Sequence, residues 1–279
     1  MKADLHIHTT ASDGSDTAAQ VLAKAAARGV GILAITDHDT IDGAVSVTDV
    51  PAGLRFIRGI EFSCAFPGGK CHILGYGYDP GDPVFLAALE EGRRLRQEKT
   101  QKRIAFLAER FGILLTEEEA AWLRRQKSPG KPQLGNIRVK RGLAPDRDAA
   151  IRDYINPSRG GADRIGAETA IRSILHAGGI PVWAHPLGGE GERRLTPAEF
   201  NVRLAILMEY GIRGLECCYS RYDRPDTAFL LQQAAQHGLL VSGGSDYHGS
   251  NKVGIELGML NADNTAVDSA ALTVLQALR

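Results

Sequence analysis

The sequence predicts an α/β protein whose largely parallel sheet is interrupted by an inserted helical segment. Short apolar runs alternate with helix-like stretches from residue 1 to about 78 and again from about 166 onwards, which is the pattern of βα units. Between these two parts, apolar residues recur at near-helical spacing among many charges. A chain of 279 residues, 43% of them hydrophobic, has room for one or two domains or for a single α/β barrel.

The first part contains four predicted strands and one predicted helix. Ser15 or Asp16 is expected to cap the helix, which carries its apolar residues on one face and ends at Gly29. The strands are expected at 31–36, after the helix, and at 3–7, 56–64 and 71–76, the last two forming a hairpin through Pro67-Gly68-Gly69.

The inserted segment is predicted to be helical, and the βα alternation returns after it. One long helix is indicated by the spacing of Phe85, Leu89, Leu95, Ile104, Leu107 and Phe111. A second helix is expected over 117–125, a third after Pro132 and a linker over 157–161. Strands at 180–184, 214–217 and 239–243 then alternate with helices over 168–176, over 198–210, up to His237 and near the C-terminus.

Charge is distributed unevenly along the chain. The formal net charge is zero, yet residues 92–147 hold 15 basic and 6 acidic side chains, a net +9, so the remainder carries −9. A cationic segment beside an anionic body would attract a phosphate-bearing molecule. The alternative is a pair of helices whose charges are simply solvated.

Several classes of protein are disfavoured by composition. No apolar run approaches the ~18 residues that a membrane-spanning helix needs. The polar start Met1-Lys2-Ala3-Asp4 lacks a signal-peptide core, so we expect a cytoplasmic protein. The four cysteines show no CxxC spacing and are expected to be reduced thiols rather than a disulfide framework.

Ligand-type side chains follow one predicted strand after another. His6 and His8 stand two apart on the first strand, so both imidazoles point to one face. In a barrel of parallel strands the C-terminal strand ends meet at one rim. We therefore expect nine side chains to converge there, enough for about three metal ions: His6, His8, Asp13, His38, Glu61, His72, His185, Asp246 and His248. Any one of these histidines alone would more often be structural, but the whole set favours a metal site. His176 and His237 precede glycines near helix C-termini and are given no chemical role.

The same residues resemble the motifs of a known family. His6-Ile7-His8, Ser12-Asp13-Gly14, Thr36-Asp37-His38, Gly59-Ile60-Glu61, Ala184-His185-Pro186 and Gly244-Ser245-Asp246-Tyr247-His248 are similar to the four motifs of the polymerase and histidinol phosphatase (PHP) family. The resemblance implies a distorted TIM-like barrel of seven βα units with a metal cluster at its rim. It also implies that His6, His8, Glu61 and Asp246 hold one ion. Glu61 would bridge to a second ion with His72 and His185, and Asp13, His38 and His248 would hold a third. Some members have histidine at the Asp13 position.

The chain looks most like the subgroup of this family with a helical insertion. Lys131-Pro132-Gln133 and Arg141-Gly142 resemble that subgroup's inserted segment, with Gln133 in place of the usual histidine. The resemblance implies a barrel of residues 1–79 and 166–279 and a helical cap of residues 80–165 that recognises substrate. Members remove phosphate from nucleoside 3′,5′-bisphosphates, and some trim short RNA from its 5′ end.

The predicted chemistry is metal-dependent hydrolysis of a nucleotide phosphate monoester. A hydroxide bridging two ions would attack phosphorus, and two or three ions of Mn²⁺, Zn²⁺ or Fe²⁺ would stabilise the developing charge. Asp37 either orients a ligand or takes a proton, or it merely caps a turn. Lys131, Gln133, Arg138 and Lys252 are expected to contact the substrate, although for Lys131 and Arg138 an exposed helix charge is the alternative.

Other functions stay open at this stage. The same cluster could serve a 5′–3′ exoribonuclease on short RNA or a histidinol phosphatase, and HxH also occurs in amidohydrolases that cleave C–N bonds. A proofreading module of a polymerase is disfavoured because 279 residues leave no room for a polymerase domain. We expect a small phosphate ester or an RNA 5′ end as the partner, and neither a membrane nor an obligate protein partner.

Overall fold

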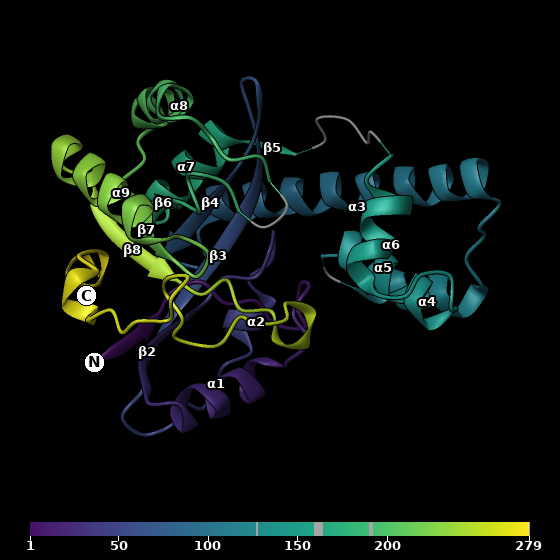
Figure 1. Cartoon of the computed structure of the whole chain (residues 1–279), viewed down its shortest axis with the longest axis horizontal. Helices are drawn as coiled ribbons and strands as arrows, with labels where there is room; N and C mark the ends of the chain where they lie inside the picture. Colours follow the sequence, from purple (N-terminus) through teal and green to yellow (C-terminus); the bar gives the residue numbers. More distant parts are fainter. Residues whose placement is uncertain (127, 159–163, 190–191, 279) are drawn as a thin grey trace.

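The computed structural model describes residues 1–126, 128–158, 164–189 and 192–278. Its centre is one eight-stranded sheet in the order β1-β2-β3-β4-β6-β7-β8, with β5 beside β3 (Figure 1). The strands are β1 (Lys2–Asp4), β2 (Val30–Ile35), β3 (Arg55–Phe66), β4 (Gly69–Tyr76), β5 (Ile165–Gly166), β6 (Ile180–Trp183), β7 (Gly214–Tyr219) and β8 (Leu240–Gly244). The predicted α/β class is therefore confirmed.

The sheet is parallel except around β4. This strand pairs antiparallel with both β3 and β6, while the other pairs are parallel. The β3–β4 hairpin turns between Phe66 and Gly69, where the sequence predicts it. His72 therefore lies near the beginning of an antiparallel strand, not at the end of a parallel one. Reversal of the chain is what brings it to the edge where the parallel strands end.

Among the described residues, β1 and β8 do not pair as strands, so the sheet is not closed into a barrel, although Ile7 and Tyr247 form an isolated parallel bridge. The chain just beyond β1 nevertheless lies beside the end of β8, because the Leu5 N–H donates to the Gly243 carbonyl at 3.1 Å and the Asp246 N–H donates to the His6 carbonyl at 2.8 Å. Gly244 permits this approach, since a Cβ at that position would stand 2.2 Å from the His6 Cβ. The two edges of the sheet are thus joined where the metal-ligand motifs lie.

Helices pack against the sheet on its outer side. α1 contacts β2, α7 contacts β4 and α9 contacts β7. α1 is capped by Thr17 in a capping box with Gln20 and not by Ser15 or Asp16 as predicted. The reason is that the Asp16 carboxylate is already occupied by the Lys24 ammonium at 2.7 Å. These helices are α1 (Ala18–Ala27), α2 (Asp42–Val45), α7 (Ala167–His176), α8 (Pro197–Tyr210), α9 (Arg224–His237) and α10 (Val274–Ala277), with 3-10 turns η2 (Gly249–Asn251) and η3 (Ser269–Ala271).

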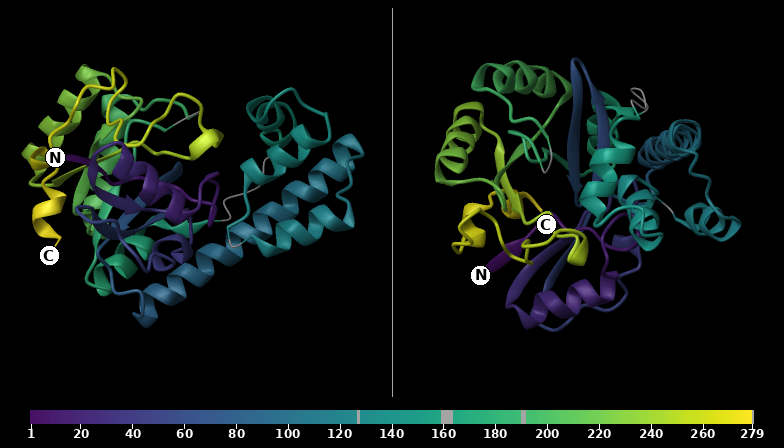
Figure 2. Two further views of the ribbon diagram at one scale, coloured as in Figure 1. Left: turned by 90° about the horizontal axis from the view of Figure 1, so that it is seen from below. Right: turned by 45° about the vertical axis from the view of Figure 1, so that its right-hand side comes forward.

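The inserted segment forms a helical unit beside the sheet. α3 (Pro83–Phe111) is long, and α4 (Glu117–Arg125), α5 (Lys131–Lys140), α6 (Arg147–Ala150) and the π-helical turn η1 (Ile151–Ile155) follow it. Figures 1 and 2 show α3 running out from the sheet, with α4, α5 and α6 along its distal half. Phe85 and Leu89 of α3 belong to the main core, whereas Leu123 and Leu134 form a separate small core. The predicted linker over 157–161 falls partly outside the described residues.

Two further predictions concern the chain as a whole. The four cysteines are buried free thiols. Within the described ranges, no helix combines the length and the apolar character that crossing a bilayer requires.

Candidate metal centre

The nine predicted ligands come together at one edge of the sheet. His6 and His8 follow β1, Glu61 lies on β3, and His72 faces it from β4. The others stand in the loops after strands β1, β2, β6 and β8, as expected for a site at the carboxyl ends of parallel strands: Asp13, His38, His185, Asp246 and His248.

A first group of donor atoms surrounds a point between His6, His8 and Glu61. Both imidazole Nε2 atoms lie 3.2 Å from Glu61 Oε2. These three atoms are fully buried and form no hydrogen bond with any described residue. Asp246 Oδ1 completes the group, 3.7 Å from His6 Nε2 and 3.3 Å from His8 Nε2. Because buried polar atoms are almost always paired, three unpaired atoms that converge beside the Asp246 oxygen fit a divalent cation.

The other oxygen of Glu61 faces a second pair of imidazoles. Glu61 Oε1 lies 2.8 Å from His72 Nδ1 and 3.1 Å from His185 Nε2. Glu61 therefore presents Oε1 to this pair and Oε2 to His6 and His8, as a carboxylate that bridges two ions would; Oε2 also lies 3.0 Å from His38 Nδ1.

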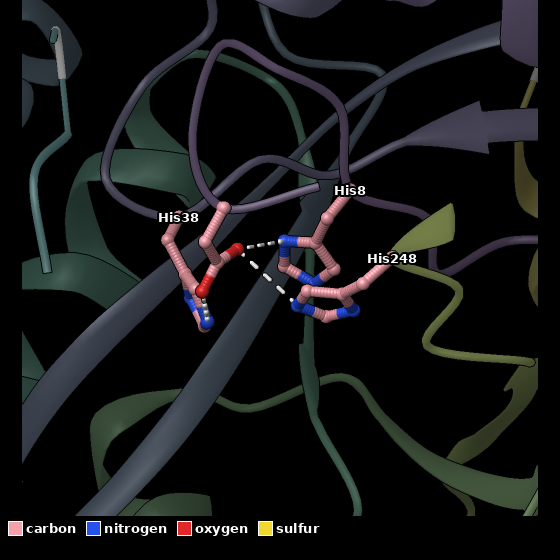
Figure 3. A group of neighbouring side chains, drawn as sticks. His8, His38 and His248 are labelled. Atoms are coloured by element: carbon pink, nitrogen blue, oxygen red, sulfur yellow. Dashed lines mark ion pairs between the residues drawn. The ribbon is translucent and has the colours of Figure 1, made fainter. Parts of the chain in front are cut away.

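A third group lies on the other side of His8. Asp13 Oδ1 is 3.2 Å from His248 Nε2, and Asp13 Oδ2 is 3.8 Å from His38 Nε2. Figure 3 shows His8, His38 and His248 turned toward a common point. His8, Asp13, His38 and His248 each have a donor atom within 4.8 Å of the others and can hold one ion. A carboxylate at position 13 thus fits this group geometrically.

The carboxylates of the site are held in their ionised form. Burial by itself would raise the pKa of Glu61, but the nearby imidazoles of His38, His6 and His72 keep that pKa well below its usual range. Burial would also raise the pKa of Asp13 and Asp246, but neighbouring imidazoles keep both pKa values well below their usual range. For Asp246 the Lys252 ammonium contributes most to this lowering. Ionised carboxylates and imidazole nitrogens are the donor set that Zn²⁺, Fe²⁺ and Mn²⁺ accept.

Backbone strain is concentrated at this edge. Four described residues other than glycine have a positive φ, and three of them belong to the site: Asp39 at 51°, His185 at 30° and Asp246 at 57°. Such conformations persist only where surrounding contacts hold them, and they are enriched at functional sites.

Asp37 shapes the loop that carries Asp13. Its Oδ1 accepts from the Thr9 N–H at 2.7 Å and from the Ser12 hydroxyl at 2.6 Å, and its Oδ2 accepts from the Thr9 hydroxyl at 2.7 Å. Its carboxylate is buried behind the loop. These contacts favour the orienting role among the alternatives that the sequence leaves open.

A cavity of about 560 Å³ extends from the metal-ligand edge to the cap. Its walls include Asp13, His38, Glu61, His72, His185, Asp246 and His248 on one side. Cationic side chains line much of the remaining wall: Lys70, Arg96, Lys99, Arg103, Lys131, Arg147, Arg152, Arg164 and Lys252. The sequence prediction missed Arg96, Lys99 and Arg103, although their spacing of three and four residues places them on one face of α3.

The cations of the cap repel one another. Burial first, and then Arg96 and Arg164, lowers the pKa of Arg103 to about 10. Burial together with Arg103, Lys70 and Arg164 lowers the pKa of Lys131 to about 8. An anion in the cavity would relieve this repulsion.

The predicted substrate contacts divide into two kinds. Lys131 and Lys252 line the cavity, and the ammonium of Lys252 contacts Asp246 Oδ2. Arg138 is 1% exposed and stacks over the Tyr154 ring, 4.8 Å from its centroid. It is not among the residues that line the cavity, whereas the sequence predicts it as a substrate contact. The reason is that α5 turns this residue into the core of the cap.

The side chain of Gln133 also forms hydrogen bonds within the protein. Its amide donates to the Ser12 carbonyl at 2.5 Å, and its side-chain oxygen accepts from the Gly130 N–H at 2.9 Å. With both ends of the amide engaged, Gln133 ties the cap to the loop before Asp13 instead of lining the cavity.

Comparison with known proteins agrees with the geometry. The sequence model of the PHP domain family matches residues 4–119 of this chain. A 3′,5′-nucleoside bisphosphate phosphatase of Chromobacterium violaceum is 31% identical over 91% of this chain and 90% of its own. The chain belongs to the PHP family. It is a metal-dependent phosphoesterase, as the resemblance of its motifs implies.

Other relatives in the PHP family cover nearly the whole chain too. A phosphoribosyl 1,2-cyclic phosphate 1,2-diphosphodiesterase of Eggerthella lenta is 33% identical over 88% of this chain and 94% of its own. A 5′-3′ exoribonuclease of Haemophilus influenzae is 29% identical over 88% of this chain and 90% of its own. Among solved structures, an amidohydrolase of Chromobacterium violaceum with bound sulfate has a TM-score of 0.83 at 26% identity, covering 100% of this chain and 96% of its own.

Proposed function

We propose that the chain removes a phosphate from a nucleoside 3′,5′-bisphosphate. The observation that carries this proposal is a single cavity with carboxylate and imidazole donors at one end and cationic side chains at the other. A substrate with two phosphates, one for each end, suits such a cavity. The name of the Chromobacterium phosphatase supports the same substrate class.

We also propose that two or three divalent metal ions occupy the three groups of donors. His6, His8, Glu61 and Asp246 would hold one ion, Glu61 with His72 and His185 a second, and Asp13, His38 and His248 a third. The unpartnered Nε2 atoms of His6 and His8 and the unpartnered Oε2 of Glu61 support this arrangement. Mn²⁺, Zn²⁺ and Fe²⁺ all suit these ligands.

When bound, such ions supply a water of lowered pKa as nucleophile and neutralise charge on the phosphoryl oxygens. The chain's own cations would place the rest of the substrate. Arg96 donates to Asp39 Oδ2 at 3.0 Å and to the Ser63 hydroxyl at 3.2 Å, so its guanidinium is held between the loop after His38 and the cavity. Lys131 also lines the cavity and donates to Asn156 Oδ1 at 2.5 Å.

The architecture proposed for this function is a distorted barrel with a cap. Hydrogen bonds between the chain after β1 and the end of β8 support a barrel whose closure is limited to the metal edge. Residues 1–79 and 166–279 would form it, and residues 80–165 the cap, with α3 contributing to the cores of both.

A second candidate is hydrolysis at the 5′ end of short RNA. Nine cationic side chains line the cavity, and among them Arg96, Lys70 and Arg147 pair with Asp39, Glu192 and Asp148 of the same wall. The other cations would suit a longer polyanion. The exoribonuclease of Haemophilus influenzae is a relative with this activity in its name.

A substrate panel with added Mn²⁺ tests the proposal. It comprises a nucleoside 3′,5′-bisphosphate, short 5′-phosphorylated RNA, phosphoribosyl 1,2-cyclic phosphate and histidinol phosphate. We expect the highest kcat/KM with the bisphosphate. A preference for any other member of the panel would contradict the proposed substrate class, and preference for the RNA would establish the second candidate.

A further inference from the structure

A buried carboxylate stands directly behind the metal centre. Glu216 lies on β7, its side chain is 0% exposed, and it is absent from the cavity wall. Within the part of the chain that the structure describes, its ion-pair partner is His6. Burying a carboxylate so completely is costly unless hydrogen bonds compensate for the lost water. Two such bonds are present, and each involves a residue of the metal centre.

The first bond sets the orientation of the His6 ring. Glu216 Oε1 lies 2.9 Å from His6 Nδ1. Because a carboxylate only accepts, Nδ1 must carry the proton and Nε2 is left as the metal-facing atom. Nε2 is the atom that lies 3.2 Å from Glu61 Oε2, and no described residue forms a hydrogen bond with it. The hydrogen bond thus assigns the tautomer that a ligand in this position requires.

The second bond holds the backbone of His185. Glu216 Oε2 accepts from the His185 N–H at 2.7 Å. His185 has a φ of 30°, in the left-handed region that side chains with a Cβ rarely adopt. This conformation directs its Nε2 to within 3.1 Å of Glu61 Oε1. A strained backbone needs such an external contact to persist.

We propose that Glu216 is a positioning residue that preorganises ligands of two metal ions at once. One oxygen orients His6 toward the first group of donors, and the other holds His185 toward the second. The two groups share Glu61, so Glu216 supports the bridged pair of ions from behind. Among the described residues, its hydrogen bonds go to His6 and His185 and not to Asp13, His38 or His248 of the third group. This inference rests on the metal arrangement proposed above.

Glutamine is the most informative replacement for Glu216. Glu216→Gln keeps the size but offers one acceptor oxygen and one donor NH₂ group, and the native partners are two donors. Whichever way the amide turns, either His6 Nδ1–H or the His185 N–H loses its acceptor. Glu216→Asp keeps two acceptor oxygens and the charge on a shorter side chain, so it tests partial rescue. Asp226→Asn is the matched control, because Asp226 is a buried carboxylate of the same part of the fold that pairs with Arg194.

Metal binding to the chelator-treated protein is the measurement. The full-length chain and the three variants are titrated with Mn²⁺ and with Zn²⁺ by calorimetry, and thermal unfolding of the metal-free proteins is recorded beside it. Changing such a supporting residue typically weakens metal affinity ~10- to 100-fold. We expect a loss of this size in Glu216→Gln for two ions, a smaller loss in Glu216→Asp, and no change in a remaining weaker site. Asp226→Asn should change unfolding but not metal affinity.

Each result distinguishes this inference from the proposed function. Wild-type affinity in Glu216→Gln, or an equal loss in Asp226→Asn, would overturn the role of Glu216. If the wild-type chain bound fewer than two ions, the metal arrangement itself would be wrong. Because binding is measured without substrate, an error about the nucleotide would leave the result unaffected.

Discussion

Removing a cation from the cap should lower kcat/KM for a substrate with two phosphates more than for a substrate with one, although the same kind of bond is hydrolysed in both. We consider Arg103→Met and Lys131→Met, which keep the apolar stems of the side chains and remove their charges. Both residues line the cavity. If they contact the second phosphate of a bisphosphate, each substitution removes a charge-assisted contact of roughly 1.5–3 kcal/mol. That corresponds to a loss of about 10- to 150-fold in kcat/KM.

The two substitutions should not be additive. Arg103 lowers the pKa of Lys131, so Arg103→Met raises that pKa and strengthens the remaining charge above pH 7. The loss of kcat/KM in the double variant should therefore differ from the product of the two single losses. Such non-additivity is usual for neighbouring charged residues.

The assay compares a nucleoside 3′,5′-bisphosphate with p-nitrophenyl phosphate, which has no second phosphate. Hydrolysis of p-nitrophenyl phosphate should change little in either variant. Arg138→Met is the control, since Arg138 stacks on Tyr154 away from the cavity; it should leave the ratio of the two kcat/KM values unchanged. Equal losses on both substrates, no loss on either, or the same selectivity change in Arg138→Met would refute the reasoning.

Three further outcomes are expected. Elemental analysis of active protein should give two or three transition-metal ions per chain, with activity lost on chelation; less than one ion per chain in active protein would contradict the metal centre. Glu61→Gln should be the most damaging single ligand substitution, because the two oxygens of Glu61 face two groups of donors; near-normal turnover and metal content would exclude bridging. Deprotonation of Lys131, whose pKa is lowered to about 8, should raise KM for the bisphosphate as pH rises through 8, and the rise should vanish in Lys131→Met. A KM for p-nitrophenyl phosphate that rose in the same way would assign the effect to another group.

Much of the metal centre could be predicted because its signals are local. Alternation along a strand puts His6 and His8 on one face, and parallel strands bring their carboxyl ends together whatever the helices between them contain. The side chains that support these ligands could not be found in this way. Glu216 stands in the middle of an apolar strand, and its two partners lie 210 and 31 residues away.

The sequence by itself determined the α/β alternation, the inserted helical segment with its excess of positive charge, and the set of donors that hold metals in this family. Only the tertiary structure decided which cations face those donors. Helical spacing places Arg96, Lys99 and Arg103 on one face of α3, and it places Arg138 on α5. It does not determine which face of either helix turns toward the cavity. That choice depends on how the two helices pack, and packing directs Arg103 into the cavity and Arg138 into the core of the cap. The direction of β4 was decided in the same way, by pairing with β3 and β6, since strand propensity is the same for either direction of the chain.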